Sequence, residues 1–315
     1  MLADNDFPGL GIAVVIPCHN EAATVADVIR GFRRALPTAE VYVFDNDSQD
    51  ATALAAVKAG ARVLKEPRRG KGNVVRRIFA DIDADVYVMA DGDGTYDPSA
   101  APDLVMALIS ERADMVVGTR RGVTEDAGRR GHAVGNRLFN ALYGRFFGND
   151  FTDIFSGYRA FTRRFVKSFP AISTGFEIET EMSVHASLLK IPTAELALAY
   201  GTRPEGSASK LRTYRDGARI LWTLLMLLKE TRPAVFFGVL GAAAAALGLL
   251  LAVPLLWTWA ETGLVPRLPT AVLATGLMVV ACLFATCGLI LDSLSRGRLE
   301  QKRILYLGVP ALRAQ

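Results

Sequence analysis

The stretch from Asp85 to Pro98, D-V-Y-V-M-A-D-G-D-G-T-Y-D-P, decides the fold. Its first part, 86–90, is a short apolar run of β-favouring residues, which predicts a buried strand. The run ends in Asp91-Gly92-Asp93, so two carboxylates follow the carboxyl end of a strand, where open α/β sheets bind their ligands. Paired carboxylates in a tight loop suit a hard divalent cation. An ordinary acidic turn has the same composition, so spacing alone leaves both interpretations open.

Short apolar runs alternate with segments of helical periodicity through the first part of the chain. We expect strands at 12–16, 41–44, 61–64, 86–90 and 115–117, with a helical segment after each of the first four. Strands that alternate with helices at this spacing predict an α/β domain with a mostly parallel, doubly wound sheet.

Polar side chains follow three of these predicted strands. Any one of them would more often be a helix cap or a turn residue. Because the carboxyl ends of parallel strands meet at one edge of a sheet, the three clusters together favour a nucleotide site with a metal-bridged diphosphate. The clusters are Asn20 with Glu21, Asp45 with Asp47, and Asp91 with Asp93. The chain lacks the dinucleotide motif G-x-G-x-x-G after its first strand, and the G-K-G at 70–72 lacks the spacing of a P-loop.

The last third of the chain has a different composition. The runs from Ala234 to Trp257 and from Leu268 to Leu291 each contain 24 residues without a charge. A helix of that length spans roughly 36 Å, which is enough to cross a hydrocarbon core of about 30 Å. Two buried core helices are the alternative, but the chain has too little polar sequence around these runs to cover both. We therefore expect two transmembrane helices.

The charges that flank the apolar runs predict their orientation. Lys229 and Arg232 precede the first run and four cations follow the second, whereas the connecting turn carries only Glu261 and Arg267. By the positive-inside rule, we expect a multi-pass protein of the inner (plasma) membrane, with the polar domain and both termini in the cytoplasm. The acidic start of the sequence has no apolar core, so we expect no signal peptide. The three cysteines form no disulfide framework and no metal-ligand spacing.

Several of these motifs resemble a known family as a group. The segments V-V-I-P-C-H-N-E at 14–21, F-D-N-D-S-Q-D-A-T at 44–52, G-K-G-N at 70–73 and the D-G-D-G stretch are similar to the signature of glycosyltransferase family 2. The segments at 135–140, 151–161 and 175–182 resemble the dolichyl-phosphate mannose synthase branch, and especially the bacterial polyprenyl-phosphate glycosyltransferases of GtrB type. The resemblance covers about residues 10 to 230 and implies a GT-A fold that binds a nucleoside-diphosphate sugar.

The resemblance also implies roles for individual residues. The metal would be held by Asp91 and Asp93; Thr95 stands where the mannose synthases usually carry an amide-bearing ligand, which leaves the third protein ligand open. The catalytic residues would be Asp93, Asp153 near the acceptor, and Arg159. The nucleotide-sugar site would contain Pro17, Asn20, Glu21, Asp45, Asp47, Lys71 and Asp91.

The chemistry of such a transfer predicts where positive charge is needed. A lipid monophosphate acceptor is already ionised at neutral pH, so it needs little help from a general base. The departing nucleoside diphosphate is stabilised by a divalent cation, Mg²⁺ or Mn²⁺, and by preorganised arginines. Any one arginine between 120 and 137 would ordinarily belong to a solvated basic loop, but five of them follow the fifth strand. We expect phosphate or lipid contacts from Arg120, Arg137, Ser156, Lys210, Arg212 and Arg215.

Two further segments carry charged residues in a pattern. The segment 211–230 has a basic and an apolar face, which predicts a helix lying on the membrane surface. The polar stretch 203–210 before it is either a linker or a loop that closes over the phosphates. The acidic run at 177, 179 and 181 places Glu177 and Glu181 on one helix face, where a structural role is favoured over a catalytic one.

We therefore expect a GT-A catalytic domain at 1–202, a loop and amphipathic helix at 203–232, two transmembrane helices at 233–295 and a cytoplasmic tail at 296–315. The expected function is an inverting transfer of one sugar from a nucleoside-diphosphate sugar, uridine favoured over guanosine, to polyprenyl phosphate on the cytoplasmic face. We expect a homo-oligomer and no nucleic-acid partner. A processive polysaccharide synthase and a non-catalytic membrane scaffold are the alternatives; the Q-x-x-R-W motif usual in the former is missing before the apolar runs.

Overall fold

The computed structural model describes residues 7–121, 143–148, 150–199, 201 and 213–312. The chain forms two compact units. We call residues 1–220 with 302–315 the sheet unit, and residues 221–301 the hairpin unit. Each is described by itself below.

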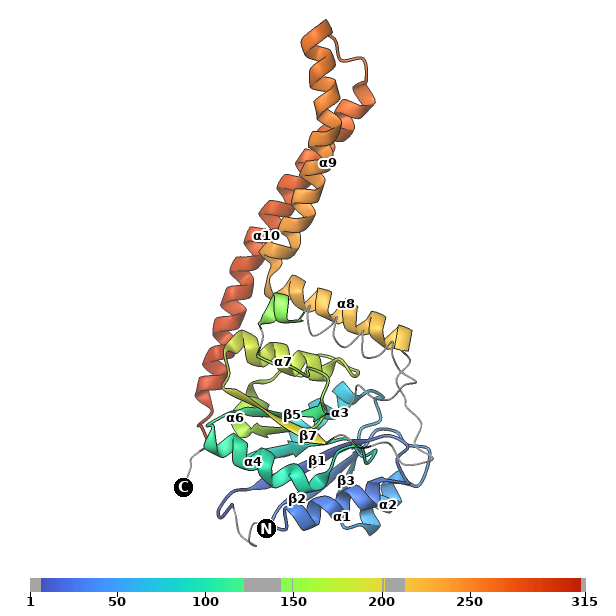
Figure 1. Cartoon of the computed structure of the whole chain (residues 1–315), viewed down its shortest axis with the longest axis vertical. Coiled ribbons are helices and arrows are strands. Elements are labelled where there is room, and N and C mark those ends of the chain that lie inside the picture. The colour runs from blue at the N-terminus through green and yellow to red at the C-terminus, as the bar shows by residue number, and fades with distance from the viewer. Residues whose placement is uncertain (1–6, 122–142, 149, 200, 202–212, 313–315) are drawn as a thin grey trace. The chain divides into compact units, whose positions relative to one another are not determined.

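The sheet unit is built on one seven-stranded sheet (Figure 1). Four of the strand pairs are parallel, and the two pairs that involve β6 are antiparallel, so the predicted mostly parallel sheet is confirmed. The strands, in spatial order, are β3 (Arg62–Lys65), β2 (Glu40–Asp45), β1 (Ile12–Cys18), β4 (Val86–Met89), β6 (Arg159–Thr162), β5 (Met115–Arg121) and β7 (Thr193–Ala199).

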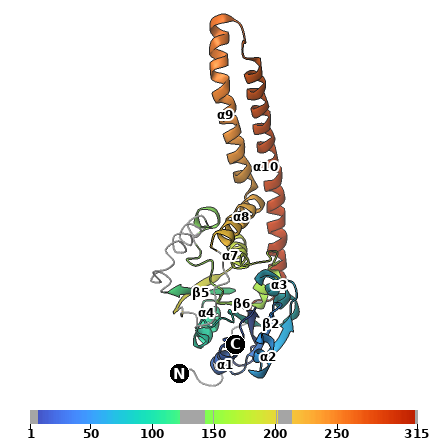
Figure 2. The ribbon, with the colours of Figure 1, turned by 90° about the vertical axis from the view of Figure 1, so that its right-hand side faces the viewer.

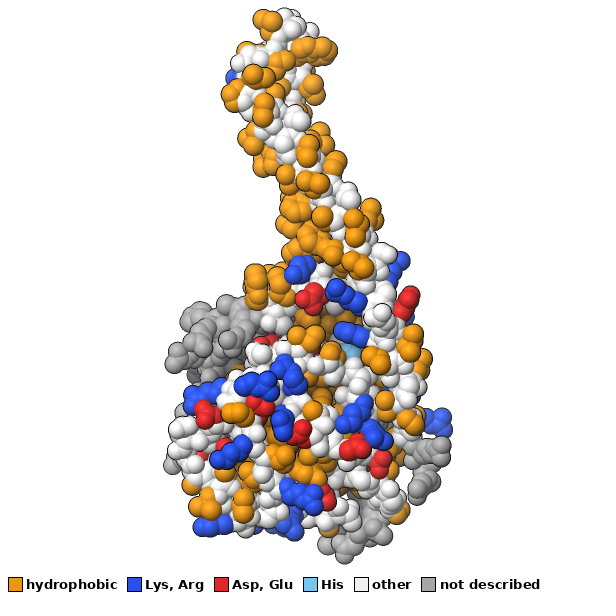
Figure 3. Space-filling view, turned by 180° about the vertical axis from the view of Figure 1, so that it is seen from behind, with side chains coloured by type: hydrophobic (Ala, Val, Ile, Leu, Met, Phe, Trp, Pro, Cys, Tyr) orange, Lys and Arg blue, Asp and Glu red, His pale blue; other side chains and the backbone are white. Residues whose placement is uncertain are grey.

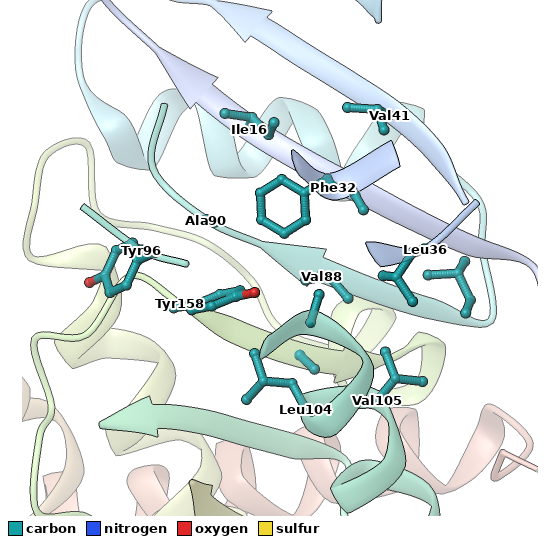
Figure 4. Close-up of a cluster of buried hydrophobic side chains, with 14 of the residues drawn as sticks. Ile16, Phe32, Leu36, Val41, Val88, Ala90, Tyr96, Leu104, Val105 and Tyr158 are labelled. Atoms are coloured by element: carbon teal, nitrogen blue, oxygen red, sulfur yellow. The ribbon is translucent and has the colours of Figure 1, made fainter. Parts of the chain in front are cut away.

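Helices cover both faces of this sheet. Strand residues alternate between the faces, so Val88 packs with α1 and α4 on one face, while Tyr87 meets Phe79 of α3 on the other. Figure 4 shows the first of these two cores, where Phe32 of α1 and Leu104 of α4 lie over the central strands. The helices of this unit are α1 (Val25–Ala35), α2 (Thr52–Lys58), α3 (Lys71–Asp81), η1 (Pro98–Ala100), α4 (Ala101–Ser110), α6 (Arg163–Ser168) and α7 (Ile178–Leu189).

The central strand β1 is longer than expected. We predicted that it stops at residue 16, before Pro17, but it runs to Cys18 and is buried throughout. Proline removes a donor, which ordinarily excludes it from the middle of a sheet. Here the ladder with β4 ends at the pair Val15↔Met89, whereas the ladder with β2 continues through Pro17 to the pair Cys18↔Asp45. The main-chain polar groups of residues two apart in a strand point to the same side, and Val15 accepts a hydrogen bond from Ala90 on the β4 side. The nitrogen of Pro17 therefore also faces that side, where the ladder with β4 has already ended, so no ladder hydrogen bond is lost.

The hairpin unit consists of two long antiparallel helices. These are α9 (Pro233–Thr262) and the part of α10 (Leu268–Gly308) that ends at residue 301, and they run side by side in Figure 2. A Cβ on Gly241 would lie 3.2 Å from Ala281 O, and one on Gly248 would lie 3.2 Å from Ala274 O, so these glycines allow close approach of the helix backbones. Most of their large apolar side chains are exposed, as Figure 3 shows along the hairpin. Both helices are long and apolar enough to cross a membrane, as predicted.

Two helices belong to both units. Helix α8 (Thr213–Thr231), close to the predicted 211–230, begins in the sheet unit, and α10 ends there. The Tyr306 hydroxyl near the end of α10 donates a short hydrogen bond to the buried Asp114 carboxylate. The guanidinium groups of Arg164 and Arg303 lie over the Tyr306 ring, 4.4 and 5.1 Å from its centroid. The last turns of α10 are therefore packed into the sheet unit.

Candidate active site

Hydrogen bonds join the loop after β1 to the loop after β2. The Asn20 main-chain N–H donates to Ser48 Oγ (3.0 Å), and Asn20 Oδ1 accepts from the Gln49 N–H (2.7 Å). The Glu21 N–H donates to Thr52 Oγ1 (2.8 Å). Asn20 has φ +51°, a left-handed conformation that asparagine tolerates better than most residues. The loop that carries the predicted residues Asn20 and Glu21 thus has a fixed shape.

The loop after β1 also contacts the acidic loop after β4. A Cβ on Gly92 would lie 2.5 Å from Glu21 Oε2 and nearer still to Cys18 Sγ, so a larger residue between the two aspartates would displace these side chains. Thr24 Oγ1 donates to the Gly92 carbonyl at 2.7 Å. The Glu21 carboxylate therefore lies beside the Asp91–Asp93 segment, and these two predicted clusters form one acidic site.

The end of β2 supplies the third cluster. The Asp45 carboxylate is buried, and its Oδ1 has no hydrogen-bond partner within the part of the chain that the structure describes. Asp47 is more exposed and pairs with Arg69 at 2.7 Å. Between them, Asn46 Nδ2 donates to the carbonyls of Glu66 (2.9 Å) and Arg68 (2.8 Å), and its Oδ1 accepts from the N–H at 70 (2.7 Å). Asn46 therefore connects the acidic end of β2 to the start of α3.

Lys71, at the start of α3, is buried between two carboxylates. Its Nζ pairs with Asp91 Oδ1 and, at 2.6 Å, with Glu179 Oε1 of α7. Burial opposes the charge on Lys71, but the two carboxylates outweigh it and raise the pKa of the ammonium, which stays charged at neutral pH. Burial also raises the pKa of the Glu179 carboxyl, and Lys71 acts against that effect. A Cβ on Gly157 would lie 2.9 Å from both Asp91 Oδ2 and Lys71 Nζ, so the loop at 157 closes tightly over the ion pair.

Asp93 lies deeper than Asp91. It is 5% exposed, and its Oδ1 accepts hydrogen bonds from the N–H (3.1 Å) and Oγ1 (2.6 Å) of Thr95. Thr95 stands where the mannose synthases usually carry an amide-bearing ligand. Here its main-chain N–H and its hydroxyl both donate to Asp93 and orient that carboxylate. The Asp91 side chain keeps 29% of its surface exposed, which makes it the more accessible of the two carboxylates.

Asp153 was predicted to act near the acceptor and Arg120 to contact phosphate or lipid. The structure joins the two in one bidentate ion pair. Arg120 Nε donates to Asp153 Oδ2 (2.7 Å) and Nη2 donates to Oδ1 (2.8 Å). Burial disfavours the ionised carboxylate, but the hydrogen bonds and charge of Arg120 prevail and hold the pKa of Asp153 below its usual value. On the other side, Glu195 of β7 accepts from the main chain and hydroxyl of Thr152 (2.8 and 2.7 Å). Asp153 is therefore an ionised anchor for a guanidinium group.

Arg159, which we predicted to be catalytic, binds the main chain of the site. Its side chain is fully buried, and it donates to the carbonyls of Ser156 (2.8 Å) and Ile154 (2.9 Å) and to Ser183 Oγ (3.1 Å). In this structure the guanidinium group has no exposed surface, which favours a structural role over a catalytic one. Arg159 stabilises the conformation of the loop 153–158, because its planar guanidinium donates to two main-chain carbonyls of that loop.

Two other predicted contact residues are also buried. Ser156, expected to contact phosphate or lipid, has no exposed surface in this structure and donates through Oγ to the Gly118 carbonyl at 2.5 Å. Pro17 is buried inside β1 and shapes the first loop from within the sheet. Arg137, Lys210 and Arg212 lie outside the described residues. The main chain of Arg215 lies in α8, but its side chain is outside the described part, so the basic face of this helix stays a prediction.

The comparison with known proteins agrees with this geometry. A family model described as Glycosyl transferase family 2 matches residues 13–169. The chain is 39% identical over 250 residues to Glycosyltransferase AglJ of Haloferax volcanii, which covers 79% of this chain and 82% of that relative. The chain belongs to glycosyltransferase family 2. A second relative, a dolichol-phosphate mannosyltransferase of Pyrococcus furiosus, is 24% identical over 266 residues, covering 80% of this chain and 73% of that one.

The sheet unit is similar in fold to solved structures of another glycosyl-transferring enzyme. Glucosyl-3-phosphoglycerate synthase from Mycobacterium tuberculosis, solved with Mn²⁺, UDP and glucosyl-3-phosphoglycerate, has a TM-score of 0.57 and 25% identity, covering 70% of this chain and 80% of that one. The same enzyme solved with Mg²⁺ and UDP has a TM-score of 0.55 and 26% identity, covering 70% and 79%. The predicted GT-A fold is thus confirmed, and the Mn²⁺ or Mg²⁺ bound in these neighbours agrees with the predicted divalent metal cofactor.

The residues of this family 2 site fit such a metal. Two carboxylates leave the same strand end two residues apart, and carboxylate oxygen is the donor that Mg²⁺ and Mn²⁺ prefer. No group of three His, Cys, Asp or Glu side chains that would hold a metal occurs among the described residues. A cation held by one or two carboxylates keeps several positions for water and substrate phosphates, so a two-residue site suits a metal that also binds a diphosphate.

Sequence reasoning missed several residues that shape the site. Asn46 lies between the two aspartates of the F-D-N-D segment, and this position in the motif is the sequence feature that indicates a role in the site. The Tyr96 hydroxyl accepts from the Gly157 N–H at 2.9 Å and joins the loop after β4 to the loop 153–158. Glu179 was expected to be structural, and no local pattern indicates its contact with Lys71 because the two residues lie far apart in the sequence.

Proposed function

We propose that this family 2 enzyme transfers one sugar from a nucleoside-diphosphate sugar to polyprenyl phosphate, with inversion, on the cytoplasmic face of the inner membrane. The main support is the acidic edge formed by the loops after β1, β2 and β4, in a chain that also carries two helices able to cross a membrane. The name of the dolichol-phosphate mannosyltransferase supports the acceptor class.

The nucleotide would bind along the ends of β1 and β2. The buried Asp45 Oδ1 has no hydrogen-bond partner among the described residues, and an N–H or O–H of the nucleotide would satisfy it. Asn20, Glu21 and Asp47 line the same edge. Solved neighbours that contain UDP support a uridine donor over a guanosine donor.

The diphosphate would lie at the end of β4. Asp91 and Asp93 would hold the metal there, and the metal would supply the positive charge that stabilises the departing diphosphate. Arg120, fixed by its two hydrogen bonds to Asp153, would add a preorganised cation near the acceptor phosphate. The acceptor oxygen is already ionised, so the chain needs no general base to deprotonate it. Attack from the face opposite the diphosphate inverts the anomeric centre.

A transfer assay tests this proposal. The full chain, purified in detergent with Mn²⁺, is incubated with polyprenyl phosphate and each member of a panel of radiolabelled UDP- and GDP-sugars. We expect one UDP-sugar to label the lipid, with one sugar on each lipid molecule. Long labelled polymers would instead show a polysaccharide synthase. Neither transfer nor donor hydrolysis with any nucleotide sugar would show a scaffold.

The proposed orientation predicts the result of a topology experiment. A reporter fused after Gln315 is expected on the cytoplasmic side, and one inserted beside Gly263, between α9 and α10, on the opposite side. Gly263 is a suitable insertion point because it is exposed and ends α9 in a left-handed conformation. Reporters for both compartments at each position provide the control. Both positions reporting the same side would contradict the model with two crossings.

A further inference from the structure

Lys71 places a second cation at the predicted metal site. Its ammonium group contacts Asp91 Oδ1, one of the carboxylate oxygens that would hold the metal. Like charges at this range repel strongly in a partly buried site, so the ammonium and a divalent cation compete for the same carboxylate. The outcome of that competition depends on what else holds Lys71.

Glu179 is the other partner of Lys71. Its Oε1 lies 2.6 Å from Nζ, and only 4% of its side chain is exposed. Its Oε2 has no hydrogen-bond partner within the described part of the chain, so the contact with Lys71 is the main polar interaction of this buried carboxylate. Glu179 therefore shares the ammonium group with Asp91 and contributes negative charge next to it.

The frame around this pair does not depend on the pair itself. The loop 171–174 is tied to α3 by Arg76, which donates to the carbonyls of Ala171 (2.7 Å) and Ile172 (2.8 Å). The same loop is tied to α7 by Glu181, which accepts from the N–H groups of Ile172 (3.0 Å) and Ser173 (2.7 Å). The first turns of α3 and α7, which carry Lys71 and Glu179, are thus held together by other contacts.

We propose that Glu179 is a positioning residue that sets the affinity of the Asp91–Asp93 pair for its divalent cation, by sharing Lys71 and so limiting its competition for Asp91. The inference rests on the metal site of the proposed function. Without the Glu179 carboxylate, Asp91 is the one remaining ion-pair partner of the ammonium among the described residues, and a cation then has to displace a stronger ion pair.

Glu179→Gln tests the proposal, with Glu177→Gln as its matched control. Both residues are buried near the start of α7 and lose the same charge, but Glu177 accepts from the N–H at 175 (3.0 Å) rather than from Lys71. Mn²⁺ binding to the full chain in detergent is measured by the paramagnetic resonance signal of unbound Mn²⁺. We expect Glu179→Gln to weaken binding about tenfold or more, a typical cost of removing a group that orients a metal ligand. Glu177→Gln is expected to bind as the parent does.

Lys71→Met separates competition from structural damage. Without the ammonium, the double variant Lys71→Met/Glu179→Gln is expected to regain the Mn²⁺ affinity of the parent, and Lys71→Met alone is expected to bind at least as tightly as the parent. Unchanged binding in Glu179→Gln, no recovery in a folded double variant, or weaker binding in Lys71→Met would each overturn the inference. If Asp93→Asn leaves Mn²⁺ binding unchanged, the proposed metal site is wrong, and the inference about Glu179 is then wrong as well.

Discussion

Asp93→Asn is expected to lower the rate of sugar transfer by at least about a hundredfold, because it removes the charge of one of the two carboxylates proposed to hold the metal. The cation and the diphosphate it neutralises bind together, so both lose affinity. The fold should survive the change. Asparagine has the shape of aspartate, and its amide oxygen still accepts from the N–H and hydroxyl of Thr95. Turnover is measured in the lipid-labelling assay, and melting of the purified protein checks the fold.

Asp97→Asn is the matched control for this prediction. It makes the same change four residues along the same loop, where Asp97 accepts from the N–H (2.9 Å) and hydroxyl (2.7 Å) of Ser99 at the start of η1. Asparagine caps helix starts about as well as aspartate, so this variant should keep its activity. Full activity in Asp93→Asn, or in the parent enzyme with excess EDTA, would falsify the metal assignment.

Asp153→Asn is expected to reduce turnover by about a hundredfold, while the KM for the nucleotide sugar changes little. The amide replaces one carboxylate oxygen with an NH₂ group, which faces an Arg120 N–H and cannot accept from it. Arg120 then loses both its bidentate geometry and the charge that holds it in place. If Arg120 serves the acceptor phosphate, the loss falls on the chemical step and on the acceptor rather than on donor binding.

Glu195→Gln and Arg120→Lys complete this experiment. Glu195 accepts from Thr152 and from the main-chain N–H of Asp153 (3.4 Å), but it does not touch the Asp153 carboxylate, and a glutamine oxygen can still accept, so its change should leave turnover near that of the parent. Arg120→Lys keeps the charge but loses the planar fork, and it should lose activity together with Asp153→Asn. Normal turnover in Asp153→Asn would mean that the pair lies away from the acceptor. An equal loss in Glu195→Gln would indicate general damage to the loop 153–158.

The core strands and the acidic edge were predictable because both depend on local sequence. Strands β1 and β4 are apolar runs that are buried throughout, and such runs form buried strands where helices cover both faces of a sheet. The aspartates follow these runs directly, so the topology of parallel strands was enough to bring them together. The family resemblance then added the fold and the metal.

Side-chain direction and long-range pairing were not predictable in this way. A motif that contains Arg159 and Ser156 shows that these residues matter, but it does not show whether they face the substrate or the protein interior, and both face the interior. The contact between Lys71 and Glu179 joins two helices from distant parts of the chain. The antiparallel strand β6, R-A-F-T, is too short and too mixed to give a periodic signal.

The place of Tyr306 has a consequence for how the protein is made. The sheet unit consists of two pieces of chain, residues 1–220 and 302–315, and the whole hairpin lies between them in the sequence. Domains generally fold as units during synthesis, from the N-terminus onward. Here the buried Asp114 carboxylate accepts a hydrogen bond from Tyr306, which is synthesised after both apolar runs. Completion of the enzyme is thereby coupled to synthesis of its apolar helices, and a nascent chain that stops before residue 302 leaves the sheet unit unfinished.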